Sequence, residues 1–236
     1  EFPKGTPIVC ACEKGRFEDV KLLITGYNDV NGSNGNNNNM TLKEYVNQVG
    51  QDSRGGERTP LMAASTYKIK KYLIDNGADL HKTYKQEFPR GTPLVCACEK
   101  GRFEDVKLLI TGYNDVNGSN GNNNNMTLKE YVNQVGKSSD GWSCTPLIAA
   151  AMYEHFQIVK YLIEQGEADP NIADSDGWNA LHEAAGYNKK DTKLIELLLT
   201  NMSLNSINKK DEVGGNTPLD LAYGYNDISP VSYTHL

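Results

Sequence analysis

Residues 145–171 read TPLIAAAMYEHFQIVKYLIEQGEADPN, and this stretch decides the fold. Its first part is short and rich in alanine, which lets two helices approach closely, and its second part carries apolar residues at helical spacing. Thr145 before Pro146 is a favourable helix start, because the hydroxyl can cap a free N–H and proline wastes no donor at the first position. The stretch therefore predicts a pair of short packed helices.

The same pattern recurs along the chain. Residues 1–50 match 87–136 at an offset of 86 and differ only at Lys4/Arg90 and Ile8/Leu94. Each 86-residue block contains two shorter units, and each unit opens with a short apolar segment. The six opening segments are GTPIVCACEKG, RTPLMAAS, GTPLVCACEKG, CTPLIAAAMYE, WNALHEAAGYN and NTPLDLAYGYN. The first five of them are followed by a second apolar segment. A fixed period of this length predicts a protein built from stacked repeats.

An opening of the form T-P-L-x-x-A-A, a short turn and a second segment ending in G-A-D-x-N resemble the ankyrin repeat. The stretch GWNALHEAAGYN at 177–188 carries the Leu-His-x-Ala-Ala core of that repeat. The resemblance implies an all-α solenoid of ankyrin-type helix pairs, with five full repeats, a partial sixth and two insertions in the finger turns between repeats. DGW at 140–142, DSDGW at 174–178 and DEVGGN at 211–216 are expected to form such turns.

The openings also place the repeat boundaries. Repeat two has three fewer residues between Pro60 and Lys71 than repeat four has between Pro146 and Lys160, so its first helix or turn should be trimmed. The chain begins with Glu rather than Met and its last residues, PVSYTHL, resemble translated adaptor sequence, so we expect a fragment with a non-native tail at 229–236. The expected repeats span 4–31, 56–81, 90–117, 141–171, 174–208 and 214–228, and the insertions span 32–53 and 118–139.

Each insertion contains the stretch NGSNGNNNNMTLKEYVNQVG, at 31–50 and again at 117–136. The asparagine tract has no apolar residue and is expected to be mobile. Thr41 and Glu44 have the spacing of a capping box, and Gly50 stands where a helix would stop. We therefore expect a short helix at 42–49 and its copy at 128–135, docked through Tyr45 and Tyr131.

Two other uses of the insertion were weighed. Asp29, Asn31 and Ser33 match the first three ligand positions of an EF-hand loop, but Asn34 replaces the required glycine and Met40 the required glutamate. This argues against calcium. Glycosylation sequons arise readily by chance in a chain so rich in asparagine; they occur at Asn31, Asn39, Asn117, Asn125 and Asn201.

Composition limits the classes of partner. The chain has 236 residues, a net charge of −6 and a sequence pI near 5.3, which gives no electrostatic case for nucleic acid or an anionic membrane. No apolar run approaches the roughly 18 residues of a membrane-spanning helix. The odd number of cysteines, five, favours reduced thiols. With no signal peptide visible, we expect a cytoplasmic monomer.

Candidate catalytic and metal groups were compared with packing roles. Cys10/Cys12 and Cys96/Cys98 lack further Cys or His neighbours that would complete a zinc site, and Cys12 and Cys98 replace an alanine of the helix. His182 could be a base, but in ankyrin repeats the His of Leu-His-x-Ala-Ala bonds the adjoining turn. No metal, cofactor, nucleophile or phosphate-binding motif is present, and we predict no enzyme.

A row of aromatic residues is the strongest sign of function. Tyr67, Tyr153 and Tyr187 stand at the same distance from the start of their units. In an ankyrin stack this place faces the concave groove and the turns form its rim, although the rings could instead pack against neighbouring helices. We predict a scaffold that binds a partner protein, or alternatively a regulatory or targeting segment of a larger enzyme or channel; a purely structural spacer is a third possibility. The proposed partner-binding residues are Trp142, Tyr153, Trp178, Tyr187, Tyr67, Tyr223, Asp176, Glu99 and Lys100.

Overall fold

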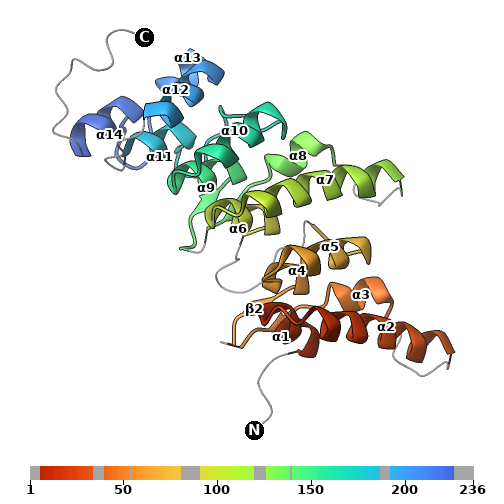
Figure 1. The fold of residues 1–236 in the computed structure, drawn as a ribbon. Helices are drawn as coiled ribbons and strands as arrows, with labels where there is room; N and C mark the ends of the chain where they lie inside the picture. Colours follow the sequence, from red (N-terminus) through yellow and green to blue (C-terminus); the bar gives the residue numbers. More distant parts are fainter. Residues whose placement is uncertain are drawn as a thin grey trace. The chain divides into compact units, whose positions relative to one another are not determined.

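The computed structural model describes residues 6–33, 40–53, 55–80, 91–119, 126–138, 140–186 and 192–225, without the side chains of 28–33, 114–119 and 225. The chain divides into two compact units. Unit 1 is Glu1–Pro93 with Lys107–Gly121, and unit 2 is Leu94–Val106 with Asn122–Leu236. Both are built from short helices arranged as consecutive pairs (Figure 1). An all-α repeat fold is therefore confirmed.

In unit 1, the inner helices α1 and α4 pack against each other, and each packs against the longer outer helix of its own pair. The outer helices α2 and α5 also touch, and a two-stranded hairpin leads into α4 (Figure 1). The elements are α1 Pro7–Glu13, α2 Phe17–Ser33, α3 Leu42–Val46, β1 Gly50–Gln51, β2 Glu57–Arg58, α4 Pro60–Ala63, α5 Tyr67–Asp75 and the part of α7 from Lys107 onward.

In unit 2, α11 lies between α9 and α14, while α10 and α12 pack on their outer side (Figure 1). A second hairpin leads into α9. The elements are α6 Pro93–Glu99 from Leu94 onward, the start of α7 Phe103–Ser119, α8 Leu128–Val132, β3 Gly136–Lys137, β4 Ser143–Cys144, α9 Pro146–Met152, α10 Phe156–Glu164, α11 Ala180–Gly186, α12 Thr192–Asn201, α13 Leu204–Ile207 and α14 Pro218–Tyr225.

The Thr-Pro openings start helices as their chemistry predicts. The hydroxyl of Thr145 accepts the N–H of Ile148 at 3.2 Å, and Thr59 caps α4 in the same way. Proline follows at the first helical position in both. Within α9 the three alanines are fully buried, which lets α9 pack closely on α10 and α11.

Repeat two is trimmed in its inner helix. Helix α4 has only four residues, whereas α9 has seven, because the backbone leaves the helix at Ala64 (ψ 120°). Thr66 then caps α5, so Tyr67 is the first residue of an outer helix. Tyr67 therefore starts an outer helix, whereas Tyr153, at the same distance from the start of its unit, ends an inner one.

The insertion contains the capped helix that its sequence indicates, but the helix is shorter. Thr41 Oγ1 accepts the N–H of Glu44 at 3.2 Å, and the Thr41 N–H donates to the Glu44 carboxylate at 2.6 Å. Helix α3 ends at Val46 instead of residue 49, and Gly50 begins a strand. The ring of Tyr45 stacks on Tyr27 of α2, with centroids 4.3 Å apart. Tyr45 thus docks the short helix α3 on α2.

Helix α2 runs further than the repeat pattern suggested. It continues past residue 31, the expected end of repeat one, to Ser33, and α7 runs likewise to Ser119. The backbone at Asp29, Asn31 and Ser33 is therefore helical, which is incompatible with an EF-hand loop. The asparagine tracts themselves, 34–39 and 120–125, lie outside the described residues, as does the tail at 229–236.

Candidate partner-binding surface

The finger turns of unit 2 are closed by a short polar side chain at their first residue. The backbone N–H of Trp142 donates to Ser138 Oγ at 3.1 Å, and that of Trp178 donates to Asp174 Oδ1 at 2.8 Å. In both turns the first residue also donates its N–H to the tryptophan carbonyl at 2.8 Å. The two tryptophans therefore occupy the same place in two similar turns.

Their side chains nevertheless have different surroundings. Trp178 is half-buried: its ring centroid lies 5.8 Å from that of His182, and a Cβ at Gly186 would meet its ring at 3.7 Å. Trp142 is 59% exposed. Strand β4 places two more residues between Trp142 and its helix than separate Trp178 from its own, which is about 6.8 Å of extended chain. Trp178 supports the fold, and Trp142 is available at the surface.

Tyr153 lies at the C-cap of α9, where it meets the finger of the same repeat. Its hydroxyl donates to Asp140 Oδ2 at 3.3 Å. One face of its ring stacks on His155, with centroids 6.3 Å apart and the planes 21° from parallel. The side chain remains 38% exposed. Tyr153 is thus a positioned ring at the surface, next to the turn that carries Trp142.

His155 connects this place to the preceding repeat. Its Nε2 lies 3.1 Å from the carbonyl oxygen of Glu99, and its ring packs against Gly101, where a Cβ would come within 2.6 Å of it. The Glu99 side chain is buried, which does not support the expectation that it contacts a partner. Lys100 is exposed. We call Trp142, Tyr153, Asp140, Glu154 and Lys100 the finger surface.

The remaining candidate residues lie elsewhere. Tyr67 is 49% exposed in unit 1, and Tyr223 is 43% exposed on α14. Asp176 is half-buried, and its backbone carbonyl accepts the N–H of Glu212 at 2.9 Å, which joins two successive turns. Tyr187 lies outside the described residues. Of the predicted set, the structure brings together Trp142, Tyr153 and the turn that carries Lys100.

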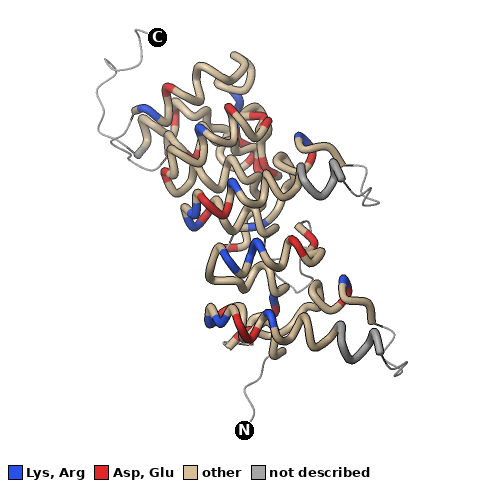
Figure 2. The backbone as a smooth tube through the Cα atoms, turned by 45° about the vertical axis from the view of Figure 1, so that its right-hand side comes forward, with Lys and Arg blue, Asp and Glu red and all other residues tan. Residues whose placement is uncertain are grey.

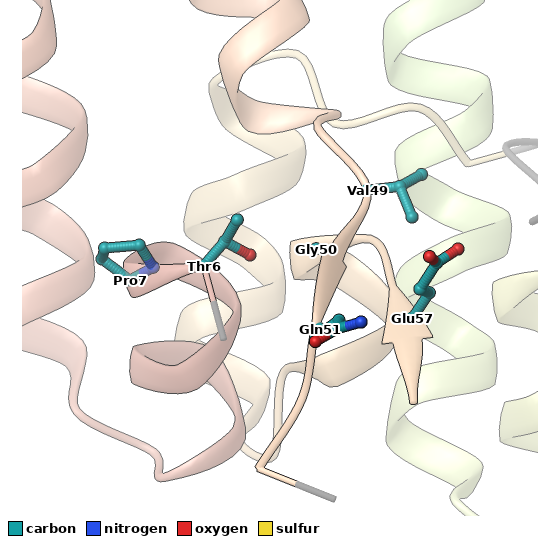
Figure 3. A pocket seen from close by; sticks show the side chains of 6 residues that line it. All are labelled: Thr6, Pro7, Val49, Gly50, Gln51 and Glu57. Carbon is teal, nitrogen blue, oxygen red and sulfur yellow. The ribbon is translucent and has the colours of Figure 1, made fainter. Parts of the chain in front are cut away.

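Two hollows were also considered. In unit 1 an open hollow of about 540 Å³ lies between the start of α1 and the β1–β2 hairpin, where the Thr6 side chain points toward Gly50 (Figure 3). A Cβ at Gly50 would overlap Thr6 Oγ1, so the glycine is required there. In unit 2 an apolar hollow of about 380 Å³ is lined by α11–α14, including Leu199, Leu204 and Ile207. Neither hollow contains a set of groups suited to catalysis.

A family profile described as ankyrin repeats (3 copies) matches residues 33–120 and 117–211. The chain belongs to the ankyrin-repeat family. Among its relatives are the palmitoyltransferase AKR1 of Lachancea kluyveri (28% identical, over 58% of this chain and 20% of the relative), an ankyrin repeat protein of fowlpox virus (26%, over 75% and 47%) and the tyrosine-protein kinase HTK16 of Hydra vulgaris (28%, over 64% and 21%). The chain therefore spans between a fifth and about half of the length of these relatives.

The ankyrin histidine has the packing role expected for it. His182 is fully buried in α11, and its Nδ1 lies 2.8 Å from Asn179 Oδ1. Burial lowers the pKa of His182 below 6.5, and backbone groups of Asn216 and Lys209 oppose part of that shift. The neutral imidazole is thus tied to Asn179 at the start of its own helix and lies near backbone groups of the following turn.

The buried thiols are unreactive. Burial raises the pKa of Cys12 and of Cys144 to about 12, and that of Cys98 well above its usual value. Thiols with such pKa values stay protonated and are poor nucleophiles and metal ligands at neutral pH. Within the described ranges no three His, Cys, Asp or Glu side chains gather as a metal site, and no helix has the length and apolar character needed to cross a bilayer.

Sequence reasoning missed two residues of the finger surface, Asp140 and Glu154, and one residue that supports it, His155. Asp140 was treated only as part of a turn, although it holds the Tyr153 hydroxyl. His155 occupies the place that Arg16 and Arg102 hold in the first and third repeats, and this difference in sequence could have pointed to it. Glu154 stands where those repeats have glycine. Charged residues of both signs are interspersed along the described backbone (Figure 2), so charge alone does not single out this place.

Proposed function

We propose that this ankyrin-repeat chain is a protein-interaction scaffold and that the finger surface contacts its partner. The observation that carries the proposal is the pair of exposed rings, Trp142 and Tyr153, at the turn fixed by the Tyr153–Asp140 hydrogen bond. Tryptophan and tyrosine supply large contact areas at low entropic cost and dominate many protein interfaces. Binding by burial of these rings needs no reaction, and we propose that the chain catalyses none.

The other exposed candidates extend the proposal. Tyr223 and Tyr67 are offered as further contacts, whereas Trp178 and Glu99 are proposed to support the surface because they are partly or wholly buried. Tyr187 and Asp176 remain predictions. We also propose five full repeats and part of a sixth. The five free cysteines favour a reducing compartment for such a scaffold.

The test compares binding and stability. A partner retained by the immobilised chain would be identified, purified and titrated by calorimetry against wild type and a Trp142→Ala/Tyr153→Ala variant. Loss of two interface rings should weaken binding at least about tenfold, since a hot-spot ring contributes more than ~1 kcal/mol. Leu22→Ala, which removes an exposed apolar side chain from α2 in unit 1, is the control. Unchanged binding together with a large drop in the urea midpoint would show that the rings serve packing.

A second function is favoured by the names of two relatives. The chain matches a palmitoyltransferase and a tyrosine-protein kinase, over 20% and 21% of their lengths. It is accordingly proposed, as the alternative, to be a regulatory or targeting segment of a larger enzyme. Sequencing the intact transcript decides between the two, because a catalytic domain in the same reading frame would establish the alternative.

A further inference from the structure

The finger surface also indicates the chemistry of its partner, and this inference rests on the proposed function. Two carboxylates accompany the rings. Asp140 belongs to the same five-residue turn as Trp142, and its Oδ2 accepts the Tyr153 hydroxyl at 3.3 Å. Glu154 directly follows Tyr153 and is exposed. The aromatic groups of this surface are therefore bordered by negative charge.

The acidic residue at 154 is specific to this repeat. The equivalent residues of the first and third repeats are Gly15 and Gly101, with φ of +69° and +65°. Glu154 adopts φ +59°, a conformation that a side chain makes unfavourable by roughly 1 kcal/mol. The repeat that exposes Trp142 and Tyr153 thus has a carboxylate at a turn where the first and third repeats have glycine.

The basic groups near this surface lie in the preceding repeat or make contacts with other groups. Lys100 lies in the turn of the preceding repeat, and Arg102, just before α7, is within 3.9 Å of Asp105 in the first turn of that helix. His155 directs Nε2 to the Glu99 carbonyl and a ring face to Tyr153. Among the described residues of the finger and the helix end that carry the two rings, the exposed charged residues are Asp140 and Glu154, and Lys137 of β3 is half-buried.

We infer that the finger surface binds an arginine side chain presented by an extended segment of the partner protein. A guanidinium is planar, stacks on aromatic faces and forms paired hydrogen bonds with carboxylates, so it matches rings and carboxylates in one place. The net charge of −6 favours approach of a basic segment. The aromatic rings supply contact area, and the two carboxylates select the charge.

The experiment uses the whole chain and a short probe. In Trp178→Phe, Trp142 is the only tryptophan, and its fluorescence is titrated with the blocked peptide Arg-Gly-Arg-Gly-Arg. The same peptide with citrulline in place of arginine has nearly the same shape without charge, and a lysine version keeps only the charge. Calorimetry on the wild-type chain repeats the titration in case Trp178→Phe lowers stability.

We expect saturable binding of the arginine peptide, at least about tenfold tighter than the citrulline peptide and several-fold tighter than the lysine peptide. Asp140→Asn and Glu154→Gln should each weaken it several-fold. Glu196→Gln removes the same charge from an exposed site on α12 and should leave affinity unchanged. Lys100→Glu should strengthen binding.

Three results would overturn the inference. Equal weakening by Glu196→Gln would mean that the peptide senses only net charge. Equal affinity for citrulline would remove the role of the carboxylates, and equal affinity for lysine would remove that of the planar guanidinium. None of these results bears on whether a natural partner requires Trp142 and Tyr153, which the binding test of the proposed function decides separately.

Discussion

Leu22 and Leu108 occupy the same position in two helices of identical sequence, yet Leu22 is 70% exposed and Leu108 only 7%. One turn further along, the same contrast holds for the glycines. A Cβ at Gly112 would lie 3.2 Å from Ile74 Cγ2, whereas nothing lies within 4 Å of Gly26. Ile74 of α5 thus lies against α7 at Gly112, whereas nothing lies against the matching place of α2.

This pair gives a matched test of what burial contributes. Leu108→Ala should lower the free energy of unfolding by about 2–5 kcal/mol, because it removes buried methyl groups and leaves a cavity. Leu22→Ala, in the same local sequence, should change it by less than about 0.5 kcal/mol. Urea denaturation followed by circular dichroism measures both. Equal losses of stability in the two variants would mean that each leucine contributes through its own helix and not through contact with a neighbouring helix.

The helix of each insertion is fastened to the next repeat by one asparagine. Asn47 Nδ2 donates to the Gly77 carbonyl at 2.9 Å, and Asn47 Oδ1 accepts the Asp79 N–H at 2.6 Å. Asn133 makes the same two bonds in its copy, to Glu167 and Asp169. Asn47 is only 6% exposed, so its partners have little access to water.

Replacing this asparagine should be costly. Asn47→Ala leaves a carbonyl and an N–H without partners and should destabilise the chain by about 2 kcal/mol or more. Asn47→Asp keeps the acceptor for the Asp79 N–H but loses the donor to Gly77, so it should lie between wild type and Asn47→Ala. Thermal unfolding of the three proteins ranks them. A midpoint for Asn47→Ala equal to that of wild type would refute the fastening role.

Repeat spacing predicted the helix pairs, their Thr-Pro starts and the capping box at Thr41 because these depend on neighbours within one turn. The residue that bonds one repeat to the next was not identified from the sequence. YNDVN at 27–31 resembles the terminal turn of a repeat, but the inter-repeat bonds are made by Asn47, sixteen residues beyond Asn31, after the insertion. From local sequence, either Asn31 or Asn47 could make the bonds to the next repeat, and only the contacts across repeats identify Asn47.

The candidate surface was predictable in part. The repeat pattern predicted that Trp142 lies in a finger turn and Tyr153 near the end of its helix, but it left open whether the rings are exposed or packed. The difference between Trp142 and Trp178 was not seen, although two extra residues separate Trp142 from its helix. Glu99 was expected at the surface because glutamate is usually solvated, but its side chain is covered.

Two substitutions in the turn between the helices of a repeat should change the free energy of unfolding in opposite directions. Gly101→Ala should destabilise by about 1 kcal/mol or more, because φ is +65° and the new Cβ would press on His155. Glu154→Gly should stabilise by about 0.5–1 kcal/mol, because it relieves the positive φ of a residue with a side chain. Calorimetric unfolding checks both, and Lys100→Ala at the exposed neighbouring residue is the control. Destabilisation by Glu154→Gly would show that its side chain contributes more than the turn loses.

His182 predicts how stability depends on pH. Its pKa in the folded chain is below 6.5, chiefly because burial disfavours the imidazolium. As pH falls below 6.5, the unfolded chain takes up a proton on this residue before the folded chain does. The free energy of unfolding should therefore decrease from pH 7 toward pH 5 and stop responding to this group once pH is below the folded pKa.

The measurement is the urea midpoint at half-unit steps of pH between 7 and 5. His182→Gln should be less stable at pH 7, because it changes the buried contact with Asn179, and should have a shallower dependence on pH. His155→Gln, at a partly exposed histidine, tests whether the loss of any histidine flattens the curve. A His182→Gln slope equal to that of wild type would show that other groups take up the proton. A shallower slope in His182→Gln alone would assign the proton uptake to the buried histidine of α11, and would mean that acid destabilises the fold by charging that side chain.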